Sequence, residues 1–388
     1  MSLIRKLMRD AALAGSCAAS FLVPSAHAGT HTVLYSFGTG GDAGNPAASM
    51  TGGGSTLYGT AGGGAHSAGA VFQVSNTGSE KLVYSFANGP NDGATPVAPV
   101  VNVGGALYGT TQYGGSTACN SGCGTVYGVT TTGAESMLYK FQGGNDGANP
   151  TAGLLNDKGT MYGTTFYGGG ANNYGTVFSI TADCTEKVLY AFKGGSDGAN
   201  PMGGLIKIGK TLYGTTYTGG GYYGTVFSLT TAGVKKTLYT FKDGADGAYP
   251  EASLVAIGKT LYGMTQSGSP NYDGTVFSLS TKGKYKTLYS FKGGADGSGP
   301  EGSLINAGGT LYGVTYSGGS TTACSGYGCG TVFSVAPKTG AETVVYAFQG
   351  GNDGLHPEGG LNTIKNAMYG TTNSGGANYN GTVFTAVP

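Results

Sequence analysis

The sequence predicts an all-β protein, a seven-bladed β-propeller made of four-stranded antiparallel blades. The first observation is a phrase, Thr-Leu-Tyr-Gly-Thr-Thr at residues 211–216, that recurs at intervals of 49 to 57 residues. Its tyrosine stands at Tyr58, Tyr108, Tyr162, Tyr213, Tyr262, Tyr312 and Tyr369. Self-similarity at such a period is typical of repeat architectures. The second observation is that the apolar runs are short, rich in Thr, Val, Tyr, Phe and Leu, and bounded by glycine, which favours strands over helices.

Each repeat is expected to hold four strands, as residues 201–249 illustrate. The strands run over 201–206, 210–216, 224–230 and 235–241, with turns or Gly-rich loops between them. First strands are expected to begin near residues 46, 96, 150, 201, 250, 300 and 357. Leu212 and Gly214 point to one face of the second strand and Tyr213 to the other, so both faces are apolar. A sheet buried on both faces fits a blade packed between two neighbours.

The third observation concerns the two ends of the repeat region. It begins with a strand of the fourth type, Thr32 to Phe37, and ends with a strand of the third type, Gly381 to Phe384. The last repeat therefore lacks a fourth strand that the N-terminal segment can supply. Such pairing closes a ring and removes an open sheet edge. A linear solenoid would instead need polar caps at its ends, and the sequence offers none.

The first 28 residues have the pattern of a secretory signal. Arg5, Lys6 and Arg9 precede a short apolar stretch over 11–23, and Ala-His-Ala at 26–28 fits a cleavage site. The apolar stretch is too short to span a bilayer, and no later segment predicts a transmembrane helix. We expect a single domain over 29–388, secreted or periplasmic, with association with the cell surface left open.

The charge of the remaining chain narrows the classes of partner. After residue 28 the chain carries 17 basic residues, all lysine, and 18 acidic residues. A near-neutral chain without arginine argues against nucleic acid, and it excludes the arginine cluster of a sialidase-like site. Neither a nucleophile elbow nor a phosphate-binding loop is present. We therefore expect a monomer that is more plausibly a binding protein than an enzyme.

Five cysteines follow the predicted signal, and four of them form two local pairs. Cys119 and Cys123 share one loop, and Cys324 and Cys329 share the equivalent loop four repeats later. In an exported protein this pattern predicts two disulfides. The pairs lie in non-adjacent repeats, so a shared zinc ion is not expected. Cys184 is left over as a free thiol whose role the sequence does not define.

The repeat phrase also resembles a known family. The order LYGTT, GG, GTVF, LYSF, DG and P is similar to the GloVer or HAF tandem repeats of bacterial exported proteins. The similarity covers residues 31–388, with drift to Gly-Ala-Val-Phe at Gly69 and to Gly-Thr-Val-Tyr at Gly124. The resemblance implies an extracellular repeat protein. It implies no known catalytic residues.

One aspartate recurs four residues before the proline that opens each repeat. The seven positions are Asp42, Asp92, Asp146, Asp197, Asp246, Asp296 and Asp353. A calcium site needs six or more converging oxygens, which one aspartate per loop does not supply. The pattern favours a structural turn in which each carboxylate caps nearby N–H groups.

Tyrosines gather in the loops expected on one face of the ring. The candidate binding residues are Tyr217, Tyr222, Tyr223, Tyr249, Tyr272 and Tyr316, and further loop tyrosines are Tyr113, Tyr167, Tyr174, Tyr327 and Tyr379. Tyrosine among Gly, Asn and Ser is typical of recognition surfaces for glycans or peptides. The alternative is that each ring packs over its own Gly-rich loop.

The asymmetric feature of the repeats is a set of three glutamates. Glu251, Glu301 and Glu358 directly follow the opening proline in three successive repeats, where the other four carry Ala47, Val97, Thr151 and Met202. If the first strand lines the channel, the carboxylates form a half-ring at its mouth, close to His356. They could serve as catalytic carboxylates or hold a cation with His356 as a further ligand or base. The alternative is a solvated acidic rim, and no other cofactor is expected.

Three functions follow from these observations. The first is a non-catalytic propeller that presents a Tyr/Gly/Asn-rich face to a glycan or a surface protein. The second is a polysaccharide hydrolase or lyase that uses Glu251, Glu301, Glu358 and His356. The third is a structural component of a surface layer or matrix. The low content of charge and histidine favours the first and third.

Overall fold

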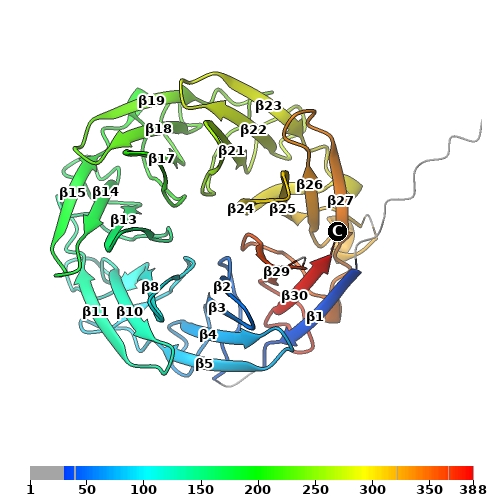
Figure 1. The fold of residues 1–388 in the computed structure, drawn as a ribbon, viewed down its shortest axis with the longest axis horizontal. Helices are drawn as coiled ribbons and strands as arrows, with labels where there is room; N and C mark the ends of the chain where they lie inside the picture. Colours follow the sequence, from blue (N-terminus) through cyan, green and yellow to red (C-terminus); the bar gives the residue numbers. More distant parts are fainter. Residues whose placement is uncertain (1–29, 39–40, 321, 366, 388) are drawn as a thin grey trace, which may run out of the picture.

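The computed structural model describes residues 30–38, 41–320, 322–365 and 367–387. The predicted signal segment lies outside these residues. Seven four-stranded antiparallel sheets surround a central axis, so the predicted seven-bladed propeller is confirmed (Figure 1). Within the described ranges the only helices are short 3-10 turns: η1 (Gly195–Asp197), η2 (Gly294–Asp296), η3 (Cys324–Gly326) and η4 (Gly351–Asp353).

We number the blades along the chain and give their strands from the axis outward. Blade 1 contains β2 (Thr51–Gly53), β3 (Thr56–Ala61), β4 (Ala70–Ser75) and β5 (Glu80–Ser85), and blade 2 contains β7 (Val101–Val103), β8 (Ala106–Thr111), β10 (Thr125–Thr130) and β11 (Glu135–Lys140). Blade 3 contains β12 (Leu155–Asp157), β13 (Thr160–Thr165), β14 (Thr176–Ile180) and β15 (Glu186–Ala191), and blade 4 contains β16 (Ile206–Ile208), β17 (Thr211–Thr216), β18 (Thr225–Thr230) and β19 (Lys235–Thr240). Blade 5 contains β20 (Val255–Ile257), β21 (Thr260–Thr265), β22 (Thr275–Ser280) and β23 (Tyr285–Ser290), and blade 6 contains β24 (Ser298–Ala307), β25 (Thr310–Ser317), β26 (Thr331–Val335) and β27 (Glu342–Ala347). Blade 7 contains β28 (Asn362–Ile364), β29 (Ala367–Thr372), β30 (Thr382–Val387) and β1 (Thr30–Ser36), and a small ribbon pairs β6 (Gly93–Ala94) with β9 (Tyr113–Gly114).

The N-terminal strand closes the ring as predicted. β1 pairs antiparallel with β30, from Thr30 opposite Val387 to Ser36 opposite Thr382. In Figure 1 the blue β1 lies beside the red β30 at the outside of blade 7. The sheet edge of β30, which would otherwise be open, is thereby covered by the chain's own first strand.

Most inner strands begin later than the sequence predicts. In blade 4 the strand begins at Ile206 rather than at Pro201, and only β24 includes its proline. The segment between proline and strand bonds to the neighbouring blade instead of its own second strand. The Gly204 N–H donates to the Ser253 hydroxyl (2.8 Å), and the Thr215 hydroxyl donates to the Ala252 carbonyl (3.4 Å). Proline also lacks the N–H that a strand would use.

The core lies between the blades, and the glycine of the repeat phrase makes room for it. Gly214 of β17 pairs with Phe227 of β18, whose ring lies over the glycine and is fully buried. That ring meets Phe192 of blade 3 edge-on, with the ring centroids 5.3 Å apart. A methyl group on Gly214 would lie 2.8 Å from the Phe227 ring. The phrase therefore needs glycine at its fourth position because the aromatic layer between blades occupies the space.

Replacing that glycine should weaken the layer. Gly214→Ala forces the Phe227 ring and Leu205 to move, and we expect it to lower the free energy of unfolding by about 1–3 kcal/mol. Urea denaturation followed by circular dichroism measures the loss. The matched control is Gly53→Ala, because nothing lies within 4 Å of a methyl group there. Equal stability of the two variants would contradict the proposed role of the glycine.

Candidate functional site

The residues that follow the seven opening prolines meet at one cavity on the axis. Its volume is about 360 Å³, and each blade contributes the residue directly after its proline: Ala47, Val97, Thr151, Met202, Glu251, Glu301 and Glu358. The structure therefore brings the three predicted glutamates together, from blades 5, 6 and 7. The opposite side of the cavity, from blades 1 to 4, presents no charge at this position.

Amide side chains contact two of the glutamates. The Gln266 amide donates to Glu301 Oε1 at 3.4 Å, and the Asn373 amide donates to Glu358 Oε2 at 3.2 Å. Both amides stand directly after the repeated phrase, at the position that Tyr217 occupies in blade 4. Sequence reasoning missed them, although their constant position after the phrase was a usable signal. Among the described residues no lysine forms an ion pair with these glutamates.

Burial raises the pKa of all three glutamates, and Glu251 and Glu358 reach the range in which a carboxyl group is partly protonated near neutral pH. Burial, then the charges of Glu301 and Glu358, raises the pKa of Glu251 to about 7. Burial, then the charge of Glu301, raises the pKa of Glu358 to about 7. Burial also raises the pKa of Glu301, against the opposing effect of the Gln266 hydrogen bond. A carboxyl group in this state can donate as well as accept hydrogen bonds.

Two aromatic pairs stand beside the carboxylates. Tyr217 packs on Tyr249 with ring centroids 5.1 Å apart, and Tyr316 stacks on His356 at 4.2 Å with the rings 4° from parallel. Burial, then the charge of Glu251, raises the pKa of Tyr217. Burial, then the charges of Glu358 and Glu301, raises the pKa of Tyr316. Burial lowers the pKa of His356, so its ring is neutral at pH 7.

The backbone before the opening proline is left-handed in every blade, including those that carry the aromatic pairs. Tyr249 and His356 precede their prolines with φ of 58° and 56°, in the left-handed region. Asparagine, which tolerates this region, stands at the equivalent place in three other blades, at Asn45, Asn149 and Asn200. A tyrosine or histidine costs roughly 1 kcal/mol more in this conformation. Blades 5 and 7 thus place rings beside the glutamates where the turn itself favours asparagine.

The predicted binding tyrosines divide into two groups. Tyr217, Tyr249 and Tyr316 stand beside the glutamates, and Tyr223 contacts Tyr249 with ring centroids 6.2 Å apart. In contrast, Tyr222 and Tyr272 are 80% and 70% exposed, and none of the six tyrosines lines the axial cavity itself. The structure therefore assembles four of the six tyrosines into one group near the axis.

The seven repeated aspartates stabilise their own loops by accepting hydrogen bonds. In blade 4 the Tyr239 hydroxyl donates to Asp246 Oδ2 at 2.8 Å, and the Lys242 N–H donates to the same oxygen at 3.1 Å. All seven aspartates accept from the tyrosine of the preceding outer strand and from one backbone N–H. Sequence reasoning missed the tyrosine partner, although its spacing of seven or eight residues from the aspartate is constant. Over the described ranges no cluster of three His, Cys, Asp or Glu is arranged for a metal ion.

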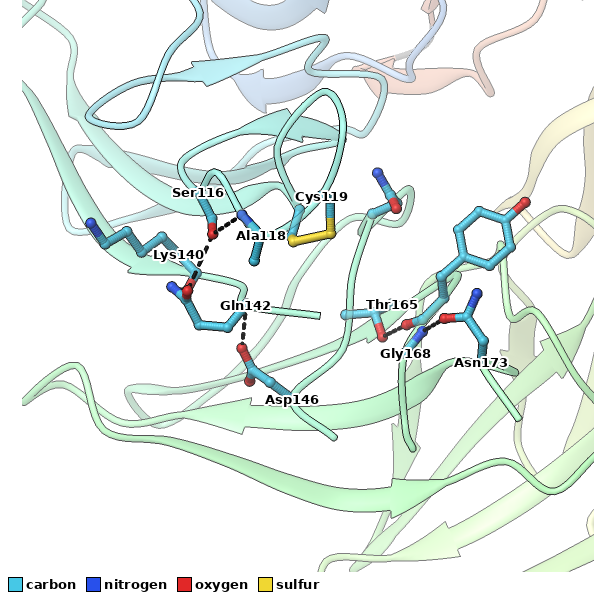
Figure 2. The surroundings of a disulfide bond; sticks show 12 residues. Ser116, Ala118, Cys119, Lys140, Gln142, Asp146, Thr165, Gly168 and Asn173 are labelled. Atoms are coloured by element: carbon cyan, nitrogen blue, oxygen red, sulfur yellow. Dashed lines mark hydrogen bonds between the residues drawn. A yellow bond between two sulfur atoms is a disulfide. The ribbon is translucent and has the colours of Figure 1, made fainter. Parts of the chain in front are cut away.

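Both predicted disulfides are formed. Cys119 bonds to Cys123 and Cys324 bonds to Cys329, while Cys184 is a free and exposed thiol. Figure 2 shows the first disulfide near the loop in which the Gln142 N–H donates to Asp146. The second supports the candidate site, because the His356 N–H donates to the Cys329 carbonyl at 2.9 Å. In the described part of the chain we find no helix with the length and apolar character needed to cross a bilayer.

The coupling between the glutamates can be tested directly. Because the charge of Glu301 has the largest effect of any charge on both neighbours, Glu301→Gln should lower the pKa of Glu251 and of Glu358 by roughly half a unit to one unit. A 13C NMR titration of the glutamate carboxyl groups measures both values. Glu342→Gln, at the outside of blade 6, is the control and should leave them unchanged. Unaltered titration in Glu301→Gln would show that the three groups are not neighbours.

Comparisons with solved structures show the propeller fold. A puromycin hydrolase S511A mutant complexed with PGG is 13% identical with a TM-score of 0.53, over 84% of this chain and 50% of that chain. The GH74 xyloglucanase from Xanthomonas campestris is 10% identical with a TM-score of 0.53, over 89% of this chain and 52% of that chain. This chain therefore spans about half of the length of either protein. At these identities the likeness concerns the fold alone.

Sequence comparison places the chain in a family. No curated protein matches it. A family model described as the Gloeobacter/Verrucomicrobia repeat matches residues 18–223 and again residues 116–325. The two matches overlap and together cover most of the chain, in agreement with the resemblance read from the repeated phrase. The chain is a member of the Gloeobacter/Verrucomicrobia repeat family.

Proposed function

We propose that the protein is an exported, non-catalytic propeller that binds a glycan across the axial cavity. The binding surface is the inner arc, which we define as Glu251, Glu301, Glu358, Tyr217, Tyr249, Tyr316 and His356. The observation that carries the proposal is the asymmetry of this arc. Carboxyl groups and aromatic pairs alternate along this arc, while the residues at the glutamate position in blades 1 to 4 are Ala47, Val97, Thr151 and Met202.

The chemistry of the inner arc suits a sugar chain. A pyranose ring presents hydroxyl groups at its edges and C–H groups on its faces. The glutamates, two of which accept from the Gln266 and Asn373 amides, can accept from hydroxyl groups and, when protonated, donate to them. Tyrosine and histidine rings offer apolar faces with polar tips, which suits the C–H faces of a sugar.

Export is part of the proposal. The two local disulfides fit an oxidising compartment, and they lie in loops that precede the third strands of blades 2 and 6. The segment over 1–28 has the composition of a secretory signal. We therefore assign the protein to the periplasm or the extracellular space, where polysaccharide is the abundant ligand.

Binding can be tested with a glycan array followed by calorimetry on the hits. Tyr249→Ala should raise Kd at least about tenfold, since it removes one face of an aromatic pair, and Glu301→Gln should raise it several-fold. Thr151→Ala is the matched control, because Thr151 stands at the glutamate position on the opposite side of the cavity. Equal affinity of the Tyr249 and Thr151 variants would overturn the proposed site. Absence of any glycan hit would favour a protein partner or a structural role.

A polysaccharide hydrolase is the second candidate. The observation in its favour is that the pKa values of Glu251 and Glu358 are raised to about 7, which suits a general acid at neutral pH. Release of reducing sugar from an array hit, lost in Glu358→Gln, would establish this function in place of simple binding. Binding without release of reducing sugar supports the first proposal.

A further inference from the structure

The outer strand of each blade places one side chain against the aspartate loop that follows the preceding blade. This side chain stands four residues before the strand's tyrosine, and the seven examples are His31, Glu80, Glu135, Glu186, Lys235, Tyr285 and Glu342. We call each such contact a seam. The seams lie at the outside of the ring, away from the axial cavity, along β1, β5, β11, β15, β19, β23 and β27 (Figure 1).

In three seams this side chain offers a hydrogen-bond donor to the preceding blade. The pairs are Lys235 Nζ with Asp197 Oδ1 at 2.9 Å, Tyr285 OH with the Asp246 carbonyl oxygen at 2.6 Å, and His31 Nδ1 with Asp353 Oδ1 at 3.2 Å. Each of these contacts joins two blades that share no sheet hydrogen bonds.

In the other four seams a carboxyl group faces a carboxyl group. The pairs are Glu80 with Asp42, Glu135 with Asp92, Glu186 with Asp146, and Glu342 with Asp296. One oxygen each of Glu80, Glu186 and Glu342 is buried and has no hydrogen-bond partner among the described residues. The hydrogen bonds that each aspartate accepts from a tyrosine and a backbone N–H stabilise its charged form, so the proton of the pair belongs on the glutamate. Only a proton on one of the two carboxyl groups gives such a seam its hydrogen bond.

We propose that these four seams are proton-sensitive joints, in which a protonated glutamate donates to the facing aspartate and holds adjacent blades together. Loss of the proton leaves two like charges in a partly buried contact and loosens the ring. This inference is independent of the proposed glycan site. The seams with Lys235 and Tyr285 lack the second carboxyl group and serve as internal controls, whereas the His31 seam contains a titratable imidazole of its own.

Other titratable side chains also lie near the four glutamate–aspartate pairs. Tyrosines face the pairs: Tyr35 at Glu80, Tyr84 and Tyr127 at Glu135, Tyr139 at Glu186, and Tyr289 at Glu342. The aspartate loops of the first three pairs contribute no cation. Lys292 faces only the Glu342 seam, where the Tyr289 hydroxyl also bonds to Glu342. Burial, then the charge of the facing aspartate, raises the pKa of all four glutamates to about 7.

The direction of the pH effect follows from these values. The ordinary glutamate pKa is 4.5, and the folded value is about 7, so the folded protein binds more protons between these limits. Stability contributed by the seams is fully present below about pH 4.5 and is lost as the pH rises through about 7. Above that pH the loss is complete.

The test compares melting temperatures at pH 5 and pH 8 at constant ionic strength. Two variants are compared, and both carry Glu251→Gln, Glu301→Gln and Glu358→Gln, so that the axial glutamates do not titrate. The first variant carries only these three substitutions, and it should lose roughly 5 °C in Tm between pH 5 and pH 8. The second variant also carries Glu80→Gln, Glu135→Gln, Glu186→Gln and Glu342→Gln, and it should lose less than half as much. An equal loss in both proteins would overturn the proposal.

A second variant keeps the proposal testable if the sevenfold substitution impairs folding. Glu135→Lys copies the blade 4 seam, in which Lys235 contacts Asp197. It should raise Tm at pH 8 by more than at pH 5. A 13C NMR titration of the wild-type protein should also place the pKa of Glu135 near 7. A value near 4.5 for that group would sink the idea, whatever the melting data show.

Discussion

The whole structure depends on one constraint, which is that a small sheet with two apolar faces is stable only between two neighbours. Every blade presents an aromatic ring on its third strand to the fourth strand of the blade before it, as Phe227 does to Phe192. No blade can satisfy both faces unless the ring closes. The pairing of β1 with β30 completes the seventh blade and thereby the enclosure of all the others.

Much of this arrangement could be predicted from the repeats, because they carry the interactions that every blade shares. The four strands of each blade, the closed ring and the pairing of the N-terminal strand all followed from period and composition. The need for glycine in the repeated phrase did not, because it depends on the Phe227 ring that packs over Gly214. The starts of the inner strands did not, since residues such as Gly204 bond to the next blade, and only neighbours in space decide that. The pairing of Tyr316 with His356 was also hidden, because it joins residues of two blades through the curvature of the ring.

Near-identical blades make the exceptions informative. At a given position the backbone is the same in each blade, so a change of side chain is a change of chemistry and not of scaffold. By this reasoning Glu358 differs from Thr151, and Glu135 differs from Lys235, without any difference in fold. The two sets of exceptions are separate in space, one at the axis and one at the outside of the ring. A symmetric scaffold can therefore acquire a local activity by substitution at one position of a few blades.

The pairing of β1 with β30 has a consequence for how the protein reaches its folded state. Residues 30 and 387 lie opposite each other in β1 and β30, at a separation close to the length of the domain. A growing or translocating chain cannot make this contact until almost all of it has emerged, so the first strand must wait unpaired while six blades assemble. Contacts of such long range slow folding. The waiting strand offers its free edge to other chains, which makes assembly most vulnerable to mispairing just before it ends.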